Sequence, residues 1–241
     1  MKTGRIMVDG NVMKVEEGAD GIVERKEGNY TWLPPIEPTK IIGLALNYRE
    51  HAEELKLDTA SQPVIFLKPN SSLTGHMTDI IYPKGATFVH YEGELAVVIG
   101  KKCRYASASN ALDYVAGYTI ANDVTARDFI TNTFRPPVKA KGFDTFCPIG
   151  PWLVDLNDIG DAVLRIRTLV NGNVKQDSRT DMMIYSVQEI IQYLSEFMTL
   201  YPGDVILTGT PKGIEPLKPG DRVDVEIERI GTLTNFVRQE K

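Results

Sequence analysis

Two glutamates at the start of an apolar segment are the side chains of this sequence best suited to chemistry. Glu92 and Glu94 open the stretch 90–100, and nearly every residue after them is apolar. Successive side chains of a β-strand alternate between its faces, so both carboxylates would point the same way. Apolar residues on both faces beyond Glu94 are typical of a strand buried on both sides. Buried carboxylates need a cationic partner, and a hard divalent metal suits a pair of oxygen ligands. The alternative is an exposed strand end with two solvated glutamates.

Three more polar residues could join such a site. Asp123 follows the apolar stretch 117–121, where it could be a third oxygen ligand or a cap on the strand end. His51 and Glu54 stand three apart in the segment 48–56, which is rich in helix formers, so they share one helix face. The carboxylate could then fix the tautomer of the imidazole and make it a general base. The alternative is a solvated pair on a surface helix.

Two further segments could bind an anion. Lys141 lies among apolar residues and glycines in the stretch 138–143, where it could donate to an oxyanion or be an ordinary loop lysine. Thr210 lies in the stretch 209–213, which offers backbone N–H groups and a hydroxyl to an anion. This stretch lacks the spacing of a phosphate-binding P-loop, and a tight turn between strands is the alternative.

The elements that position these residues follow from turn signals and hydrophobic periodicity. Strands are expected at 40–47, 63–68, 90–100, 117–121, 151–156, 163–170, 174–178, 205–208, 222–228 and 233–237. Helices are expected at 48–56, 109–114, 125–132 and, after a capping box at 186–189, up to Met198. The run up to Pro83 and the stretch 134–150 are expected to be irregular, and the polar segment 58–62 is a candidate lid. Strands outnumber helices without a βαβ rhythm, so the sequence predicts a β-rich α+β fold.

The first 38 residues are predicted to form a small N-terminal β-rich appendage. A hairpin is expected from the strands 5–8 and 12–15 around Asp9-Gly10-Asn11, and the proline-rich stretch 32–38 is expected to be an extended linker. A boundary near Thr39 then leaves residues 39–241 as the main domain, which carries all the candidate residues.

Composition bounds the class of protein. The chain has 241 residues, of which 42% are hydrophobic and 24% charged, as is usual for a soluble globular protein. A net charge of −5 and the lack of a basic cluster argue against a nucleic-acid partner. Two cysteines are too few for a disulfide framework. No apolar run approaches a signal core or the ~20 residues of a membrane span, so a cytoplasmic protein without a membrane partner is expected.

Six separated stretches occur together in an order that is specific to one family. They are 46–54 (LNYREHAEE), 64–69 (VIFLKP), 90–95 (HYEGEL), 113–123 (DYVAGYTIAND), 140–150 (AKGFDTFCPIG) and 207–213 (LTGTPKG). In these stretches the chain resembles the fumarylacetoacetate hydrolase family over about residues 40–238, which implies a mixed β-sandwich roll. Within the family, the stretch 134–141 (FRPPVKAK), with Asp144 and Phe146–Gly150 after it, is similar to the isomerase/decarboxylase branch of homoprotocatechuate (4-hydroxyphenylacetate) catabolism.

The resemblance implies a role for each of the candidate residues. Mg²⁺ or Mn²⁺ would be held by Glu92, Glu94 and Asp123, and Lys141 would lie near the reacting oxygen of a 2-oxo acid. Arg127 and Thr210 would bind the substrate, and His51 with Glu54 would form a base that is ordered when the lid closes. In forms of the enzyme with two repeats, one repeat retains the acidic pair; this chain is a single repeat that retains it, and so resembles the metal-bearing half. A homodimer is expected, and the need for a second repeat or subunit stays open.

The function expected from the resemblance is a metal-dependent decarboxylase and isomerase. Its substrates would be 5-oxopent-3-ene-1,2,5-tricarboxylate and 2-hydroxyhepta-2,4-diene-1,7-dioate. The alternatives are a hydrolase of acylpyruvate or fumarylpyruvate, an oxaloacetate decarboxylase, and a non-catalytic partner subunit.

Overall fold

The computed structural model describes residues 1–18, 30–58, 61–130, 136–160 and 162–241. Its strands are β1 (Lys2–Val8), β2 (Asn11–Glu16), β3 (Tyr30–Leu33), β4 (Ile41–Ala45), β5 (Val64–Lys68), β6 (Leu73–Thr74), β7 (Asp79–Tyr82), β8 (Val89–His90), β9 (Gly93–Ile99), β10 (Val115–Asn122), β11 (Thr125–Ala126), β12 (Cys147–Asp155), β13 (Arg165–Val170), β14 (Asn173–Arg179), β15 (Val205–Leu207), β16 (Arg222–Ile227) and β17 (Gly231–Gln239). Its α-helices are α1 (Arg49–Glu54), α2 (Val138–Lys141), α3 (Leu156–Ile159) and α4 (Val187–Phe197), and its 3₁₀ turns are η1 (Asn70–Ser72), η2 (Ala111–Tyr114), η3 (Arg127–Phe129) and η4 (Thr180–Met182).

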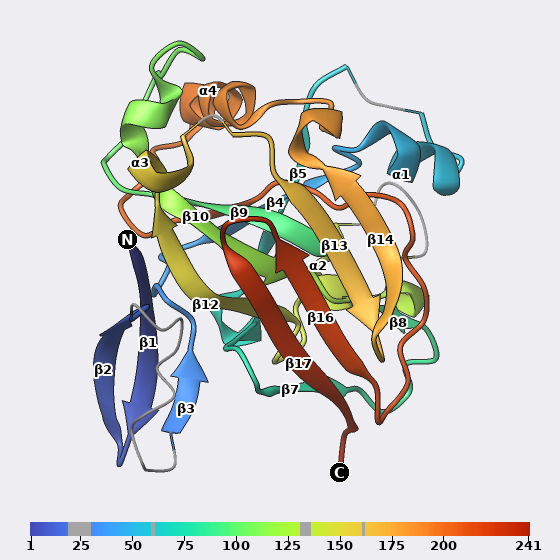
Figure 1. Cartoon of the computed structure of the whole chain (residues 1–241). Helices are drawn as coiled ribbons and strands as arrows, with labels where there is room; N and C mark the ends of the chain where they lie inside the picture. The colour runs from blue at the N-terminus through green and yellow to red at the C-terminus, as the bar shows by residue number, and fades with distance from the viewer. Residues whose placement is uncertain (19–29, 59–60, 131–135, 161) are drawn as a thin grey trace.

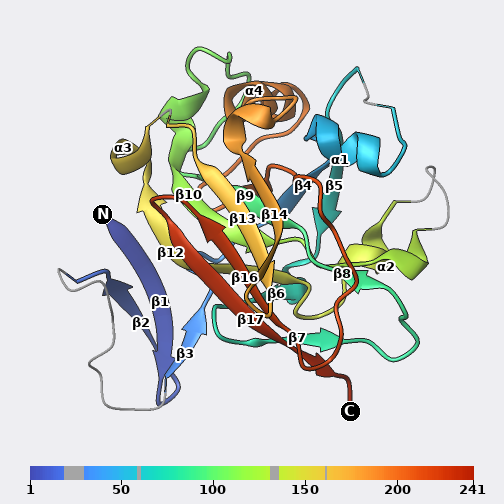
Figure 2. The ribbon, with the colours of Figure 1, turned by 45° about the vertical axis from the view of Figure 1, so that its right-hand side comes forward.

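Two large sheets pack face to face. Within the described residues, one sheet has the order β2-β1-β12-β10-β9-β15-β4-β5, with β3 beside β1 and β6 beside β12, and the other has the order β14-β13-β16-β17-β7. β13 and β16 cross in front of β9 and β10, and α4 covers one end of both layers (Figures 1 and 2). The largest apolar cluster fills the space between the sheets and α4. The expected β-rich α+β fold is therefore confirmed.

Several expected local structures are present. β1 and β2 form the N-terminal hairpin, whose turn residues Asp9 and Gly10 have φ values of 48° and 78°. The capping box of α4 has both of its hydrogen bonds, between Ser186 and Glu189. These features depend on residues close together in the chain, which is why the local pattern is enough to predict them.

The structure differs from expectation in three segments whose partners are distant in sequence. The run before Pro83 was expected to be irregular, but β7 pairs in parallel with β17. The segment 125–132 was expected to be helical, but β11 pairs with β8 before η3 begins. The stretch 134–150 was expected to be a loop, but it contains α2 and the start of β12. Short strands carry little periodic signal, and only their partners decide whether they form.

Parts of the expected segments lie outside the described residues. These are residues 19–29 of the N-terminal appendage, residues 59 and 60 of the candidate lid 58–62, residues 131 and 132 of the expected helix, and residues 134 and 135 of the stretch 134–150.

The N-terminal strands continue the larger sheet, on the side of the molecule away from α1 and α2 (Figures 1 and 2). Lys2 and Thr3 of β1 pair with β12, and β3 pairs with β1. Trp32 of β3 meets Trp152 of β12 edge to face, with ring centroids 5.1 Å apart. The boundary near Thr39 stays a prediction.

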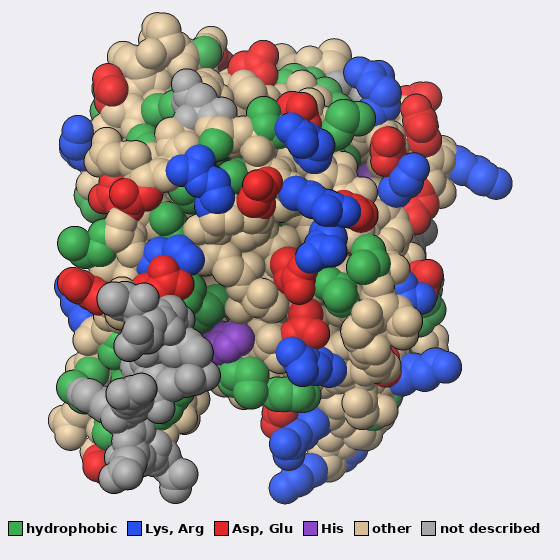
Figure 3. Space-filling model, in the orientation of Figure 1, with side chains coloured by type: hydrophobic (Ala, Val, Ile, Leu, Met, Phe, Trp, Pro, Cys, Tyr) green, Lys and Arg blue, Asp and Glu red, His purple; other side chains and the backbone are tan. Residues whose placement is uncertain are grey.

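The surface over the smaller sheet carries charges of both signs (Figure 3). Arg165 pairs with Asp177 across β13 and β14, and Arg167 pairs with Glu226 across β13 and β16. Among the described residues, no helix is both long enough and apolar enough to span a membrane.

Candidate active site

Three buried carboxylates meet where β9 begins and β10 ends. Glu92, Glu94 and Asp123 each offer an oxygen, and these oxygens all lie within 4.8 Å of one another. Antiparallel pairing places Glu94 opposite Ala121, so Asp123 follows just beyond the end of β10. Two strands that are adjacent in the sheet therefore bring together residues that are about thirty positions apart.

The strand expected over 90–100 is interrupted beside the first of these carboxylates. β8 ends at His90 and β9 begins at Gly93, so Glu92 lies in the break. The backbone N–H of Glu92 donates to Asn122 Oδ1 at 3.0 Å, and the Asp123 N–H donates to the Glu92 carbonyl at 2.8 Å. These bonds to the end of β10 hold Glu92 beside Glu94 and Asp123.

Two buried lysines contact this carboxylate group. Lys141 Nζ, at the end of α2, lies 2.8 Å from Glu92 Oε2, 2.5 Å from Asp123 Oδ2 and 2.8 Å from Thr125 Oγ1. Lys68 Nζ, at the end of β5, lies 2.5 Å from the other Asp123 oxygen. Lys68 was not among the expected site residues, although a lysine that ends an otherwise apolar strand is a signal that could have found it.

The group fits an additional cation. Three carboxylates face two ammonium groups, and Glu94 has no ion pair within the described chain, only a hydrogen bond from the Gly209 N–H at 2.6 Å. Burial, and then repulsion from Asp123 and Glu92, raises the pKa of Glu94 well above its usual range. The oxygen-only donor set is the type that Mg²⁺ and Mn²⁺ prefer.

The pKa values of Glu92 and Lys141 are shifted in opposite directions. Burial alone would raise the pKa of Glu92, but the Lys141 ammonium, together with His90 and His51, holds it well below its usual range. Burial alone would lower the pKa of Lys141, but Asp123 and Glu92 raise it above its ordinary value. Glu92 and Lys141 are therefore a charged pair, and Glu94 is the carboxylate that lacks compensation.

A histidine–glutamate pair lies on α1, as expected from its spacing. His51 Nδ1 is 3.1 Å from Glu54 Oε2, and Glu54 Oε1 accepts a hydrogen bond from the Gly213 N–H at 3.0 Å. The helix is anchored just before it begins, because the Asn47 amide donates to the carbonyls of Thr208 and Tyr185. The imidazole is thus held in one orientation on a fixed helix.

The hydroxyl of Thr210 forms two hydrogen bonds within the protein. It donates to the Gly93 carbonyl at 2.9 Å and accepts from the Gln176 amide at 2.8 Å. Gln176, on β14, was also missed from the sequence, where nothing sets it apart from other strand residues.

A cavity of about 200 Å³ opens onto these groups. Six of the eight candidate residues line it: His51, Glu92, Glu94, Arg127, Lys141 and Thr210. Asp123 and Glu54 lie behind the lining and contact Lys141 and His51. The lining also includes an apolar wall with Leu55, Leu57, Val64 and Phe66.

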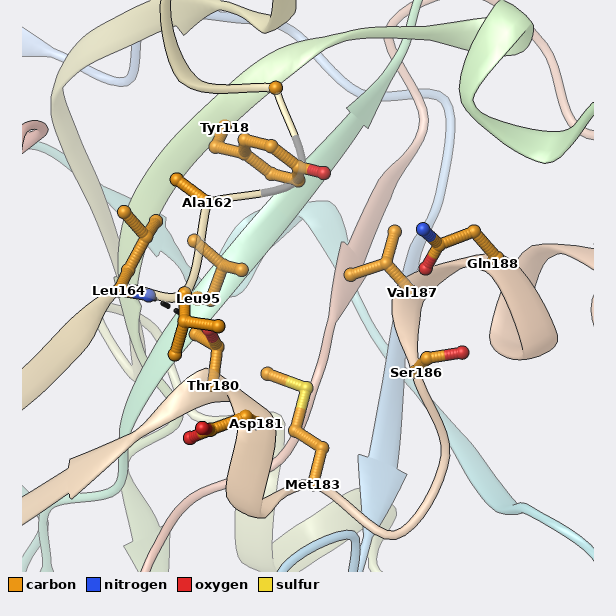
Figure 4. Close-up of a pocket in the computed structure, with 12 residues that line it drawn as sticks. Leu95, Tyr118, Ala162, Leu164, Thr180, Asp181, Met183, Ser186, Val187 and Gln188 are labelled. Carbon is orange, nitrogen blue, oxygen red and sulfur yellow. Dashed lines mark hydrogen bonds between the residues drawn. The ribbon is translucent and has the colours of Figure 1, made fainter.

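A second cavity, of about 180 Å³, is also lined by a residue of β9, the strand that carries Glu94 (Figure 4). Leu95 of β9 faces it together with Tyr118 of β10, and Leu164, Met183 and Val187 complete its apolar part. The described residues that line it include no lysine, arginine or histidine. Asp181 is the one carboxylate among these lining residues, so the second cavity lacks the combination of acidic and basic side chains found in the first.

Comparison with known proteins places the chain among enzymes of one family. The model of the fumarylacetoacetate hydrolase C-terminal region matches residues 40–238. A 4-hydroxyphenylacetate degradation bifunctional isomerase/decarboxylase of Salmonella dublin is 44% identical over 210 residues, which are 86% of this chain and 48% of that enzyme. This chain thus spans about half of the bifunctional enzyme.

Two further similarities are to an oxaloacetate tautomerase and to a solved isomerase. The mitochondrial oxaloacetate tautomerase of Rattus norvegicus is 43% identical over 216 residues, which are 86% of this chain and 69% of that protein. The crystal structure of 2-hydroxyhepta-2,4-diene-1,7-dioate isomerase from Mycobacterium marinum has a TM-score of 0.86 and 42% identity, and covers 100% of this chain and 99% of its own.

Proposed function

This chain belongs to the fumarylacetoacetate hydrolase family, and from that premise we propose that it is a divalent-metal-dependent decarboxylase and isomerase of 2-oxo and enol acids. The proposed substrates are 5-oxopent-3-ene-1,2,5-tricarboxylate, which would be decarboxylated, and 2-hydroxyhepta-2,4-diene-1,7-dioate, which would be isomerised. The supporting observation is the buried group of Glu92, Glu94 and Asp123, whose two glutamates line one cavity with His51.

In this proposal the three carboxylates hold Mg²⁺ or Mn²⁺. The bound metal would act as a Lewis acid that stabilises negative charge developing on the 2-oxo oxygen of the substrate. Lys141 lies beside the same carboxylates and would add a second positive charge near that oxygen. Arg127 lines the cavity and would pair with a substrate carboxylate.

The histidine–glutamate pair would move the proton. With Glu54 accepting from Nδ1–H of His51, the lone pair of Nε2 is left to take a proton from substrate carbon or oxygen. In isomerisation His51 would remove a proton at one position, and the enol would be protonated at another carbon. In decarboxylation the C–C bond breaks, CO₂ leaves, and the electron pair stays on the substrate as an enolate until it is protonated.

A second candidate is hydrolysis of an acylpyruvate by a water that His51 activates. The apolar wall of Leu55, Leu57, Val64 and Phe66 favours it, because such a wall would accept an uncharged acyl tail.

The deciding experiment is anaerobic turnover of the tricarboxylate with Mg²⁺, with and without chelator, run beside a series of acylpyruvates. Metal-dependent CO₂ release supports the decarboxylase. Rapid acylpyruvate cleavage without CO₂ release from the tricarboxylate would establish the hydrolase instead. A chain that binds metal and turns over neither is then assayed with oxaloacetate: release of CO₂ would establish the oxaloacetate decarboxylase, and no turnover would favour the non-catalytic partner subunit.

We also propose that the chain acts in the cytoplasm as a homodimer, on the strength of the family resemblance. Light scattering that gives the mass of a single chain would contradict the dimer.

A further inference from the structure

One glutamine of the smaller sheet reaches the strand that carries the two glutamates. Gln176 lies on β14 and is only 1% exposed. Its Oε1 accepts the Gly93 N–H at 3.1 Å, and its Nε2 donates to Thr210 Oγ1 at 2.8 Å and to the Pro211 carbonyl at 2.7 Å. The acceptor and both donors of this buried amide are thus directed at the candidate active site.

Gly93, which separates the two candidate metal ligands in the chain, is fixed by contacts to its N–H, its carbonyl and its Cα. It stands between Glu92 and Glu94, its N–H is bonded to Gln176, and its carbonyl accepts from the Thr210 hydroxyl. A Cβ at this position would overlap Thr168 Oγ1 of β13, so the start of β9 is pressed against the smaller sheet. The orientation of this peptide sets the directions in which Glu92 and Glu94 leave the chain.

The same glutamine fixes the loop 209–213. Through Thr210 and Pro211 it holds a segment whose Gly209 N–H donates to Glu94 and whose Gly213 N–H donates to Glu54. The loop therefore contacts both a candidate metal ligand and the partner of the candidate base.

We propose that Gln176 is a positioning residue. It orients Glu92 and Glu94 for metal binding and links these two side chains to the loop 209–213. This inference rests on the proposed function. Hydrogen-bonded groups behind the ligands orient them, and their loss typically costs roughly 10- to 100-fold in metal affinity.

The test compares two nearly isosteric replacements of buried amides in the same sheet. Gln176→Met removes the contacts with Gly93, Thr210 and Pro211. The matched control is Asn235→Leu on β17, because the buried Asn235 amide donates to the carbonyls of Gly75 and Thr78 at 2.9 and 3.0 Å, which belong to a loop outside the site. The dissociation constant of Mn²⁺ is measured by calorimetric titration, and the melting temperature is measured with chelator present.

Gln176→Met is expected to weaken Mn²⁺ binding about 10-fold or more, whereas Asn235→Leu lowers the melting temperature and leaves Mn²⁺ affinity unchanged. Raising the Mn²⁺ concentration should restore part of the kcat of Gln176→Met and leave the kcat of Asn235→Leu unchanged, which separates weakened metal binding from loss of stability. Should Gln176→Met fail to fold, Thr210→Val carries the test, because it removes only the hydroxyl between Gln176 and Gly93 and is also expected to weaken Mn²⁺ binding.

Equal Mn²⁺ affinity in the wild type and in a folded Gln176 or Thr210 variant would overturn the positioning role and leave the proposed function standing. A wild-type protein that binds no Mn²⁺ or Mg²⁺ would overturn both.

Discussion

At the scale of single residues, the distribution of charge distinguishes the three carboxylates from one another. Lys141 bridges Glu92 and Asp123, and Lys68 holds the second oxygen of Asp123. Among the residues that the structure describes, Glu94 receives only the backbone N–H of Gly209. Within the described residues, lysines therefore neutralise two of the carboxylates, and the third has no cationic partner.

Replacing Glu94 should separate metal binding from stability. In the folded chain the pKa of Glu94 is raised above its unfolded value, so its ionisation destabilises the fold, and stability falls as pH rises above about 4.5. Glu94→Gln is therefore expected to raise the melting temperature at pH 7 in chelator, by about 2–4 °C for each kcal/mol gained. It should also weaken Mn²⁺ binding by more than the roughly 10- to 100-fold of a change behind the ligands. Calorimetry with and without Mn²⁺ measures both; a lower melting temperature in chelator would contradict the assignment.

Replacing His51 should affect the proton transfer and not the metal. His51→Ala is expected to lower kcat by roughly 10²- to 10⁴-fold, the usual contribution of a general base. Mn²⁺ affinity should stay near that of the wild type, since the carboxylate ligands are untouched. Glu54→Gln serves as the matched variant, because it keeps a side chain of the same size and removes the charge that orients the imidazole. A kcat unchanged in both variants would rule out the pair as the base.

At the scale of elements, close packing of β4 on β5 shapes the cavity. Phe66 of β5 lies over Gly43 of β4, and a Cβ on Gly43 would overlap the ring. The same ring lies 4.7 Å from Lys141 Nζ, a cation–π distance. A glycine in one strand thus lets an aromatic ring form the floor beneath a catalytic candidate on α2.

Gly43→Ala tests this arrangement. The added methyl must displace the Phe66 ring, at a cost of about 1–3 kcal/mol in the free energy of unfolding. Because the ring moves towards the cavity, KM should rise as well. Urea unfolding and steady-state kinetics measure the two effects. Gly85→Ala is a control for loss of stability without a change at the cavity, because its Cβ would meet no atom within 4 Å and its φ of +81° alone makes alanine unfavourable. Wild-type KM in Gly43→Ala would show that Phe66 does not border the substrate.

At the scale of the whole molecule, a histidine helps to join the N-terminal strands to the rest of the fold. The His76 ring meets Trp32 of β3 edge to face, and its Nδ1 accepts the Thr234 N–H of β17 at 3.0 Å. Burial lowers the pKa of His76 to about 4, despite attraction from Asp224. Protonation would remove the acceptor that β17 uses, so folding should depend on pH through this residue.

The pH dependence of stability has a definite sign here. The folded-state pKa of about 4 lies below the ordinary value of 6.5, so the unfolded chain binds more protons between these values. The stability linked to neutral His76 is fully present above pH 6.5 and is lost as pH falls towards 4. His76→Asn keeps an acceptor and cannot titrate, so the wild type should lose on the order of 1–3 kcal/mol more than this variant between pH 7 and 4. Urea unfolding at a series of pH values measures the free energy of unfolding of both proteins. The contribution of His90 is common to both and cancels in their difference. A difference that does not change with pH would contradict the assignment.

Local pattern was enough to predict the N-terminal hairpin, the capped helix α4, the buried strand that follows the acidic pair and the shared face of His51 and Glu54. Each of these depends on residues a few positions apart, where turn chemistry and periodicity act directly. Local context also made Asp123, Lys141 and Thr210 candidates. The family resemblance added Arg127 and gave each candidate a role, and these roles stay predictions.

Only the tertiary structure brought in Lys68, which contacts Asp123 from 55 positions away, and Gln176, which contacts Gly93 from 83 positions away. It also decided that β7 pairs with β17, and that two lysines contact Glu92 and Asp123 but not Glu94, which has no ion pair in the described part of the chain. The physical reason is common to all of these: strand pairing and charge balance are set by neighbours in space, and a side chain carries no mark in the sequence of the partner it will meet across two packed sheets.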